Sequence, residues 1–426
     1  MFLLLRPRLR VAVIGAVVGL VAGCGTAKAP TAPTAPTALA TAPAPSAAPD
    51  YAATLQPKLE QLVRDMSVTG AVVLVRTPDR GNWTTTIGTG TYRGNDPVRV
   101  DDHIRVGSNT KTWTGTVILQ LVGEGRLRLS DPVATYRPDV PNGANITIEQ
   151  LLNMRSGLYN YTESLELNQA LDTQPGRVWA PEELVQLGLS RPPYFPPGTG
   201  FHYSNTNTVL LGLIAEKVTG RPLREEFRTR VFYPLGLTGT EFPEITSAAI
   251  PDPHPQGYTY AINAETIDST VLAPEVQAAA RAGTLAPKDV TSVNPSWGWS
   301  AGAGISTAED LARYVEALVG GQLLPPAIQR QRLDSVVPID PSNPQSAAYG
   351  LALARFGSLY GHSGELPGFN SFMGHDPDRK ITVVTWASLA PAPDGRGPAV
   401  ELAKAVIGEL YAGQLPQQPP DQDGAG

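Results

Sequence analysis

Strand patterns occupy both ends of the folding part of the chain, and helical patterns occupy the middle. Apolar and β-branched residues favour strands over 71–76, 83–92, 349–355, 369–375 and 381–388. Residues from about 109 to 290 show mainly helical spacing and loops, and each end carries one further amphipathic helix. A chain of this kind must complete one sheet from distant segments. We therefore predict an α+β fold, with an antiparallel sheet flanked by helices and an inserted mainly helical lobe.

We expect this folded domain to cover residues 50–415. Its α/β part is predicted over 50–108 and 295–412, and the helical lobe over 109–294. Residues 24–49 contain a short Ala-Pro-Thr repeat and further prolines, a composition typical of an extended tether. Residues 416–426 are polar and rich in proline and glycine, and are predicted to be a disordered tail.

The first residues read as an export signal. Three arginines lie within the first ten residues, and an apolar run follows over 11–22. This run suits the apolar region of a signal peptide better than a membrane span, because it is short. It ends at Val21-Ala22-Gly23-Cys24, which resembles a bacterial lipobox. We predict a lipoprotein signal peptide over 1–23, lipidation of Cys24, and a location on the extracytoplasmic face of the cell membrane; the alternative is an ordinary signal peptide or membrane anchor with an incidental cysteine.

Composition excludes several classes of protein. Cys24 is the only cysteine, so a disulfide framework and a thiolate zinc site are both impossible. The formal net charge of −6 and the lack of a basic cluster beyond the first ten residues argue against nucleic-acid binding. The five histidines show no paired metal-ligand spacing. We therefore expect neither a metal nor a cofactor.

Ser108 and Lys111 form the first candidate catalytic pair. Ser108 precedes a helical pattern, so a lysine three residues later lies on the same helix face and within hydrogen-bond reach. A serine hydroxyl becomes a nucleophile when a base takes its proton, and a lysine near a helix N-terminus can have its pKa lowered enough to serve. The structural alternative is a helix-capping serine beside a solvated lysine. Ser108 is the one serine of the chain with lysine at the third position after it.

Two further motifs follow in order along the chain. Tyr203-Ser204-Asn205 is the one Y-x-N sequence, and among the lysines and histidines only His362, in His362-Ser363-Gly364, is followed by Ser/Thr and Gly. With the serine and lysine, they resemble the active-site motifs of the serine D-alanyl-D-alanine carboxypeptidases and class C β-lactamases, the penicillin-recognising serine hydrolases. The resemblance covers roughly residues 50–412. It implies a β-lactamase/transpeptidase-like fold.

The resemblance also implies a role for each motif residue. Ser108 would form an acyl-enzyme, and Lys111 and Tyr203 would share the proton transfers, with either one as the general base. Asn205 would donate to the acyl-side amide of the substrate. The backbone N–H groups of Ser108 and Glu365 would bind the oxyanion, and His362, Ser363 and Gly364 would contact the substrate. The structural alternatives are a packed loop tyrosine, a turn asparagine and a strand-end histidine.

The substrate is less constrained than the chemistry. His362 stands where many β-lactamases of this type have lysine, which favours the carboxypeptidase branch. Glu365 would repel a free substrate carboxylate unless its side chain points away, and Arg355 is a candidate cationic anchor. A peptidoglycan stem peptide ending in D-Ala-D-Ala is the first expectation, with β-lactam hydrolysis beside it. A small ester is the second.

Two other hypotheses remain open from the sequence. Gly361 to Glu365 reads like the start of a G-x-S-x-G nucleophile elbow with Ser363 as nucleophile, but Glu365 replaces the final glycine. A bulky residue at that turn argues against this reading. The other hypothesis is an inactive lipoprotein that binds the cell wall or senses penicillin, against which the complete set of motif residues counts.

Overall fold

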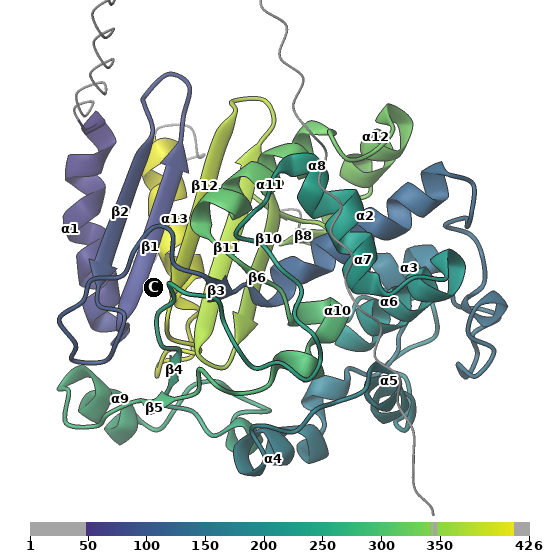
Figure 1. The fold of residues 1–426 in the computed structure, drawn as a ribbon, viewed down its shortest axis with the longest axis horizontal. Helices are drawn as coiled ribbons and strands as arrows, with labels where there is room; N and C mark the ends of the chain where they lie inside the picture. Colours follow the sequence, from purple (N-terminus) through teal and green to yellow (C-terminus); the bar gives the residue numbers. More distant parts are fainter. Residues whose placement is uncertain (1–47, 341, 344–346, 413–426) are drawn as a thin grey trace, which may run out of the picture. The chain divides into compact units, whose positions relative to one another are not determined.

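The computed structural model describes residues 48–340, 342–343 and 347–412 (Figure 1). In this part of the chain, eight strands form one antiparallel sheet in the order β2-β1-β12-β11-β10-β9-β8-β7. Their bounds are β1 (Gly70–Arg76), β2 (Trp83–Gly88), β7 (Val337–Pro338), β8 (Ala348–Tyr349), β9 (Ala354–Phe356), β10 (Leu359–Leu366), β11 (Phe369–Asp376) and β12 (Ile381–Ala387). The predicted α+β fold with an antiparallel sheet is confirmed.

The sheet joins the two ends of the folded chain. β1 pairs with β12 in a register that places Val73 opposite Thr385. Because side chains alternate across a strand, β1 contributes to two cores. Val73 and Val75 pack in the core that contains the first and last helices, α1 (Asp50–Asp65) and α13 (Pro398–Leu410). Val72 and Leu74 pack in the other core, on the face covered by α11 (Ala308–Gly320) (Figure 1).

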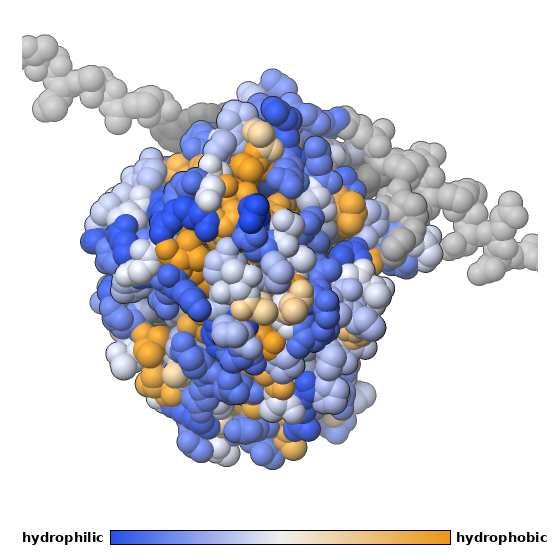
Figure 2. Space-filling view, turned by 90° about the vertical axis from the view of Figure 1, so that its right-hand side faces the viewer, coloured by the Kyte–Doolittle hydropathy of each residue, from blue (hydrophilic) through white to orange (hydrophobic). Residues whose placement is uncertain are grey.

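The helical lobe lies at one end of the sheet, on the right of Figure 1. Its central element is α2 (Thr110–Gly123), which is buried along most of its length. The other helices on this side are α3 (Ile148–Leu152), α4 (Leu165–Thr173), α5 (Pro181–Leu189), α6 (Asn205–Thr219), α7 (Leu223–Phe227), α8 (Tyr233–Leu235), α10 (Trp299–Gly302) and α12 (Pro326–Asp334). Figure 2 views this side of the molecule and shows apolar residues in patches between hydrophilic ones. The remaining helix, α9 (Pro274–Arg281), lies apart from them at the lower left of Figure 1.

Two short sheets accompany the helices. β3 (Ile104–Arg105) pairs with β6 (Ile305–Ser306), and β4 (Tyr258–Thr259) pairs with β5 (Lys288–Asp289). β3 precedes the helical lobe in the chain and β6 follows it, so their pairing joins the two segments of the α/β part. β3 leads directly into the turn that carries Ser108.

Two predicted strands need correction, and one strand was not predicted. The expected strand 349–355 is divided into β8 and β9 by a turn in which Ala352 has a φ of 50°. The expected strand 83–92 ends at Gly88, whose φ is 81° and whose position leaves no room for a Cβ, since that atom would lie 2.1 Å from the Thr69 carbonyl oxygen. β10 was not predicted as a strand, because two glycines, a histidine and a serine interrupt its apolar pattern.

The predicted export segment lies outside the described residues. This applies to the signal peptide over 1–23, to Cys24, to nearly all of the tether 24–49 and to the tail 416–426. In the ranges that are described, no helix is both long and apolar enough to cross a membrane.

Candidate active site

Ser108 lies in a single helical turn, η1 (Gly107–Asn109), between β3 and α2. Gly107 has a φ of 54°, and a Cβ at this position would lie 2.5 Å from the backbone nitrogen of Glu365. Only glycine therefore allows the turn to approach β10 so closely. Asn109 anchors the turn from the other side, because its Nδ2 donates to Ser371 Oγ at 2.7 Å. The result is a half-buried Ser108 beside the edge of β10.

Lys111 is buried completely in the first turn of α2. Its Nζ lies 2.9 Å from Ser108 Oγ, 2.6 Å from Asn205 Oδ1 and 2.7 Å from the Ala301 carbonyl oxygen. None of these partners carries a charge. Burial without a carboxylate partner disfavours the ammonium form, and it lowers the pKa of Lys111 well below its usual value. The side chain can therefore hold a neutral amine directly against the serine hydroxyl.

Tyr203 lies between Lys111 and the third motif. The Lys111 Nζ is 4.9 Å from the centre of the Tyr203 ring, and that ring lies 6.1 Å from the ring of His362. Burial raises the pKa of the Tyr203 phenol, and a hydrogen bond with Ser108 opposes the rise only in part. The resting site therefore holds Tyr203 as a phenol, which can pass on a proton but does not begin as the base.

Asn205 is the first residue of α6, and its side chain is held at both ends. Its Oδ1 accepts from Lys111, while its Nδ2 donates to Asn160 Oδ1 at 3.2 Å and to Thr162 Oγ1 at 3.0 Å. The backbone nitrogen of Asn205 also donates to Asn160 Oδ1, at 3.0 Å. The sequence analysis missed Asn160, because no spacing rule connects residues so far apart in the chain.

His362 is buried on β10, and its two ring nitrogens have different partners. Nδ1 lies 2.5 Å from the Ser363 carbonyl oxygen, and Nε2 lies 3.2 Å from the Tyr349 hydroxyl. A carbonyl can only accept, so the ring proton is on Nδ1 and Nε2 accepts from Tyr349. Burial is the main cause that lowers the pKa of His362 to about 3. The third motif is therefore neutral.

Two backbone N–H groups meet beside Ser108. β9 pairs with β10 only through Leu359–Gly361, so the following residues of β10 have no strand partner on that side within the described chain. Gly364 faces η1 there, and a Cβ on it would lie 1.9 Å from the Val106 carbonyl oxygen and 2.9 Å from the Ser108 nitrogen. The turn that carries Ser108 and the segment Gly364–Glu365 thus approach each other closely, which places the backbone nitrogens of Ser108 and Glu365 in the same part of the site.

The Glu365 side chain reaches into the cleft. The side chain is exposed at the wall of the cleft, but protein surrounds its carboxyl group on the other sides, and this desolvation raises the pKa of Glu365 to about 7. Its Oε2 accepts from Asn370 Nδ2 at 2.8 Å. The sequence left its direction open; in the structure it lines the same cavity as Ser108.

This cavity has a volume of about 640 Å³ and runs from Ser108 toward α13. Its wall near the nucleophile is aromatic and aliphatic, with Phe201, Tyr349 and Phe356 among its residues. Arg355 does not line it, which corrects the predicted carboxylate anchor: its strand neighbours Ala354 and Phe356 face the cavity instead.

Two cations do line the far part of the cavity, but each has a carboxylate partner. Arg396 donates to Asp394 Oδ2 at 2.7 Å, and Lys404 donates to Glu401 Oε1 at 2.7 Å. Neither offers an unpaired charge to a substrate.

Ser363 does not have the geometry of a nucleophile elbow. It lies inside β10, and the chain continues through a turn into β11 rather than into a helix. The elbow hypothesis is therefore wrong. Ser363 lines the large cavity next to His362, as expected for a substrate-contacting residue.

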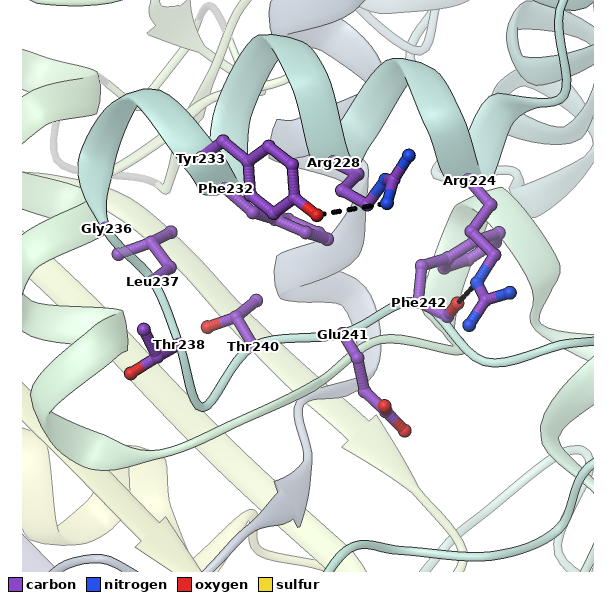
Figure 3. A pocket seen from close by; sticks show the side chains of 10 residues that line it. All are labelled: Arg224, Arg228, Phe232, Tyr233, Gly236, Leu237, Thr238, Thr240, Glu241 and Phe242. Atoms are coloured by element: carbon purple, nitrogen blue, oxygen red, sulfur yellow. Dashed lines mark hydrogen bonds between the residues drawn. The ribbon is translucent and has the colours of Figure 1, made fainter. Parts of the chain in front are cut away.

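A separate hollow of about 390 Å³ lies between α7, α8 and the loop that follows them (Figure 3). Its arginines are engaged locally: Arg228 donates to the Tyr233 hydroxyl at 3.0 Å, and Arg224 donates to the Phe242 carbonyl at 3.0 Å. None of the predicted site residues lines this hollow. Within the described ranges, no group of three or more His, Cys, Asp or Glu side chains could hold a metal ion.

A serine within hydrogen-bond distance of a buried lysine, with a tyrosine beside them, is the side-chain arrangement of a serine hydrolase. The chain belongs to the Beta-lactamase family, whose model matches residues 55–406. Its fold is the β-lactamase/transpeptidase-like fold that the sequence predicted.

Known proteins of two kinds are similar to this chain. A D-stereospecific amidohydrolase from Streptomyces sp. is 33% identical, covers 85% of this chain and 99% of its own, and superposes with a TM-score of 0.70. The D-amino acid amidase from Ochrobactrum anthropi SV3 in complex with D-phenylalanine is 25% identical, with 84% and 99% covered and a TM-score of 0.68. PbpX of Bacillus subtilis (strain 168), provisionally described as a penicillin-binding protein, is 25% identical over 78% of this chain and 73% of its own.

Proposed function

We propose that this protein hydrolyses amide bonds on the carboxyl side of a D-configured residue and releases an uncharged amine or ammonia. The observation that carries the proposal is the charge of the cleft. The carboxyl group of Glu365 lines it beside Ser108, while its cations, Arg396 and Lys404, are already paired. A leaving group with a free carboxylate meets no unpaired cation there. The similarity to a D-stereospecific amidohydrolase supports the same reaction.

The proposed reaction begins with proton transfer from Ser108 Oγ to the neutral Lys111 amine, 2.9 Å away. The alkoxide attacks the carbonyl carbon, and the resulting oxyanion binds to the N–H groups of Ser108 and Glu365. The proton then passes from Lys111, through or beside Tyr203, to the departing nitrogen as its C–N bond breaks. An ester now joins the acyl group to Ser108. Water adds to this ester with Lys111 as base, and the acid leaves as Ser108 recovers its proton.

Lys111 is the base in this proposal because the pKa shifts of the two candidates favour it. Burial lowers the pKa of Lys111 and raises that of Tyr203, so the amine is available as a base and the phenol as an acid. His362 cannot help to ionise Tyr203, since it is neutral.

D-alanyl-D-alanine carboxypeptidase action, or slow turnover of a β-lactam, is the second candidate function. The similarity to PbpX favours it, as does the predicted lipid anchor on Cys24, which would hold the protein outside the cell membrane beside peptidoglycan. Such a substrate carries a carboxylate into a cleft that contains Glu365. Hydrolysis of small esters uses the same acyl-enzyme. An inactive wall-binding or penicillin-sensing lipoprotein would not need to hydrolyse an acyl-enzyme.

The test compares substrates that differ in the configuration of the acyl residue, in the charge of the leaving group or in the bond that is cleaved. The full-length protein is assayed with D-phenylalanine amide, L-phenylalanine amide, a peptide ending in D-Ala-D-Ala, the same peptide as its C-terminal amide, and a short-chain ester. We expect the D-amide and the amidated peptide to have the highest kcat/KM. Preference for the free-acid peptide would favour the carboxypeptidase, and turnover of the ester alone would favour the esterase.

Two serine variants and one probe complete the test. Ser108→Ala should abolish hydrolysis, whereas Ser363→Ala should retain a measurable part of it. The mass of the wild-type protein after incubation with a penicillin should rise by one penicilloyl group, located on Ser108. A stable adduct without turnover of any substrate would instead favour the sensing lipoprotein.

A further inference from the structure

A small hollow of about 180 Å³ opens beside Ser108 on the side of α4. Its lining is mixed: Leu167, Leu171 and Trp297 are among its apolar residues, and Thr162, Asn168, Asn205, Asn263 and Glu365 are among its polar ones. The resemblance assigns Asn205 to the acyl side of the substrate, so this hollow is the place for the acyl residue and its side chain. It can enclose one apolar side chain next to the reacting carbonyl.

Glu365 is the one side chain in that lining, as far as the chain is described, that carries an acidic or basic group. Its carboxylate accepts a single hydrogen bond, from Asn370, and no charged group contributes to the shift of its pKa. An anion enclosed in this way, with no cation beside it, favours a positively charged ligand.

The oxyanion site determines where such a charge would lie. When the substrate carbonyl oxygen accepts from the Glu365 N–H, the reacting carbonyl carbon lies beside residue 365. The α-nitrogen of an amino acid is only two bonds from that carbon, which brings it within reach of the same residue's side chain.

We infer that the Glu365 carboxylate binds the α-ammonium group of the acyl residue, so the enzyme acts on D-amino acid amides and peptides with a free N-terminus. This inference rests on the proposed function and narrows its substrate class. An N-acylated substrate has no positive charge to offer there. The carboxylate then loses the hydrogen bonds that the ammonium would donate, and the substrate binds more weakly.

The same contact makes substrate binding depend on pH. With a pKa of about 7, Glu365 is protonated in acid and ionised above neutrality. Asn370 on β11 donates to it, and the titratable groups that line the large cavity with it from other elements are Tyr203, Tyr349, Arg396, Glu401 and Lys404. Binding of the free-amine substrate should therefore weaken as the pH falls through 7, and weaken again as the pH rises through the pKa of the substrate's own α-ammonium group at about 7.7–8.0. Binding of a neutral substrate should change little.

The experiment pairs one variant with two substrates. D-Phenylalanine p-nitroanilide and its N-acetyl derivative are assayed with wild type, Glu365→Gln and a control, Glu275→Gln, whose exposed side chain lies on α9. We expect Glu365→Gln to raise KM for the free amine about ten- to a hundredfold. KM for the N-acetyl substrate should change less than about threefold, and the control should match wild type.

The outcomes separate this inference from the proposed function. If the wild-type protein hydrolyses neither substrate, the proposed function itself is wrong. Hydrolysis of both, with an equal effect of Glu365→Gln on each or with the N-acetyl substrate preferred, would overturn the inference alone. The pH dependence of KM is an independent check, because a merely structural role for Glu365 would affect the two substrates alike.

Discussion

The hydroxyl of Tyr349 lies 3.2 Å from Nε2 of His362, and it donates to a ring whose other nitrogen is committed to the Ser363 carbonyl. Tyr349 thereby holds the histidine in one tautomer. Burial raises the pKa of Tyr349 well above its usual value, so the phenol keeps its proton. His362 of the third motif and Tyr349 thus form a neutral hydrogen-bonded pair.

The first prediction concerns this pair. His362 should remain neutral between about pH 5 and 8, because its pKa is lowered to about 3. In ¹⁵N NMR spectra its Nδ1 should carry the proton across that range. Tyr349→Phe should weaken the tautomer preference and lower kcat/KM while the free energy of unfolding changes little. A His362 that titrates near its ordinary pKa in wild type would contradict the assignment.

The second prediction concerns Lys111. Lys111→Arg places a permanent cation near Ser108, because a guanidinium group does not lose its proton, so kcat/KM should fall about 10³-fold or more. In wild type, kcat/KM should decline as the pH is lowered through the depressed pKa of Lys111, because protonation removes the base. Activity in Lys111→Arg within about tenfold of wild type would shift the base role to Tyr203.

The third prediction concerns Asn160, which positions Asn205. Its Oδ1 accepts from both nitrogens of Asn205, and its side chain is buried. Asn160→Ala should lower kcat about ten- to a hundredfold and reduce the free energy of unfolding by about 1–3 kcal/mol. Gln329→Ala is the control, because Gln329 is a buried amide that donates to the carbonyls of Leu318 and Val319 and lines neither cavity beside Ser108. A loss of stability with unchanged kcat would reduce Asn160 to a structural residue.

The fourth prediction concerns the gap between η1 and β10. Gly107→Ala would put a methyl group 2.5 Å from the Glu365 nitrogen at a positive φ. The oxyanion site should open or distort, with a loss of about 10²- to 10³-fold in kcat and about 1–3 kcal/mol of stability. Gly125→Ala, also at positive φ but with no heavy atom within 4 Å of the added methyl, separates backbone strain from the clash. Equal kcat in the two variants would argue against the oxyanion site.

The sequence predicted best what depends on local spacing. The contact between Ser108 and Lys111 follows from one helical turn. Tyr203 and His362 were found only through the order of their motifs. Their approach to Lys111 depends on how the lobe packs on the sheet.

The missed residues depend on contacts between distant segments. Asn160 and Tyr349 belong to no recognisable spacing, and their roles arise from packing around Asn205 and His362. Arg355 was predicted to line the cavity, but side chains alternate along a strand, so Ala354 faces the cavity and Arg355 lies on the opposite face. The position of the Glu365 carboxylate in the cleft could not be predicted from the sequence, because strand alternation allowed either direction for its side chain.

The pairing of β1 with β12 has a consequence for how the protein is made. β1 pairs on one side with β2, which follows it closely in the chain, but on its other side residues near 72 pair with residues near 386, so the sheet stays open until almost the whole chain has been synthesised. Contacts this distant in sequence slow folding. A chain that must be threaded through a membrane before it folds, as its first residues predict, gains from this delay, because the strand that completes the sheet is among the last parts to be exported.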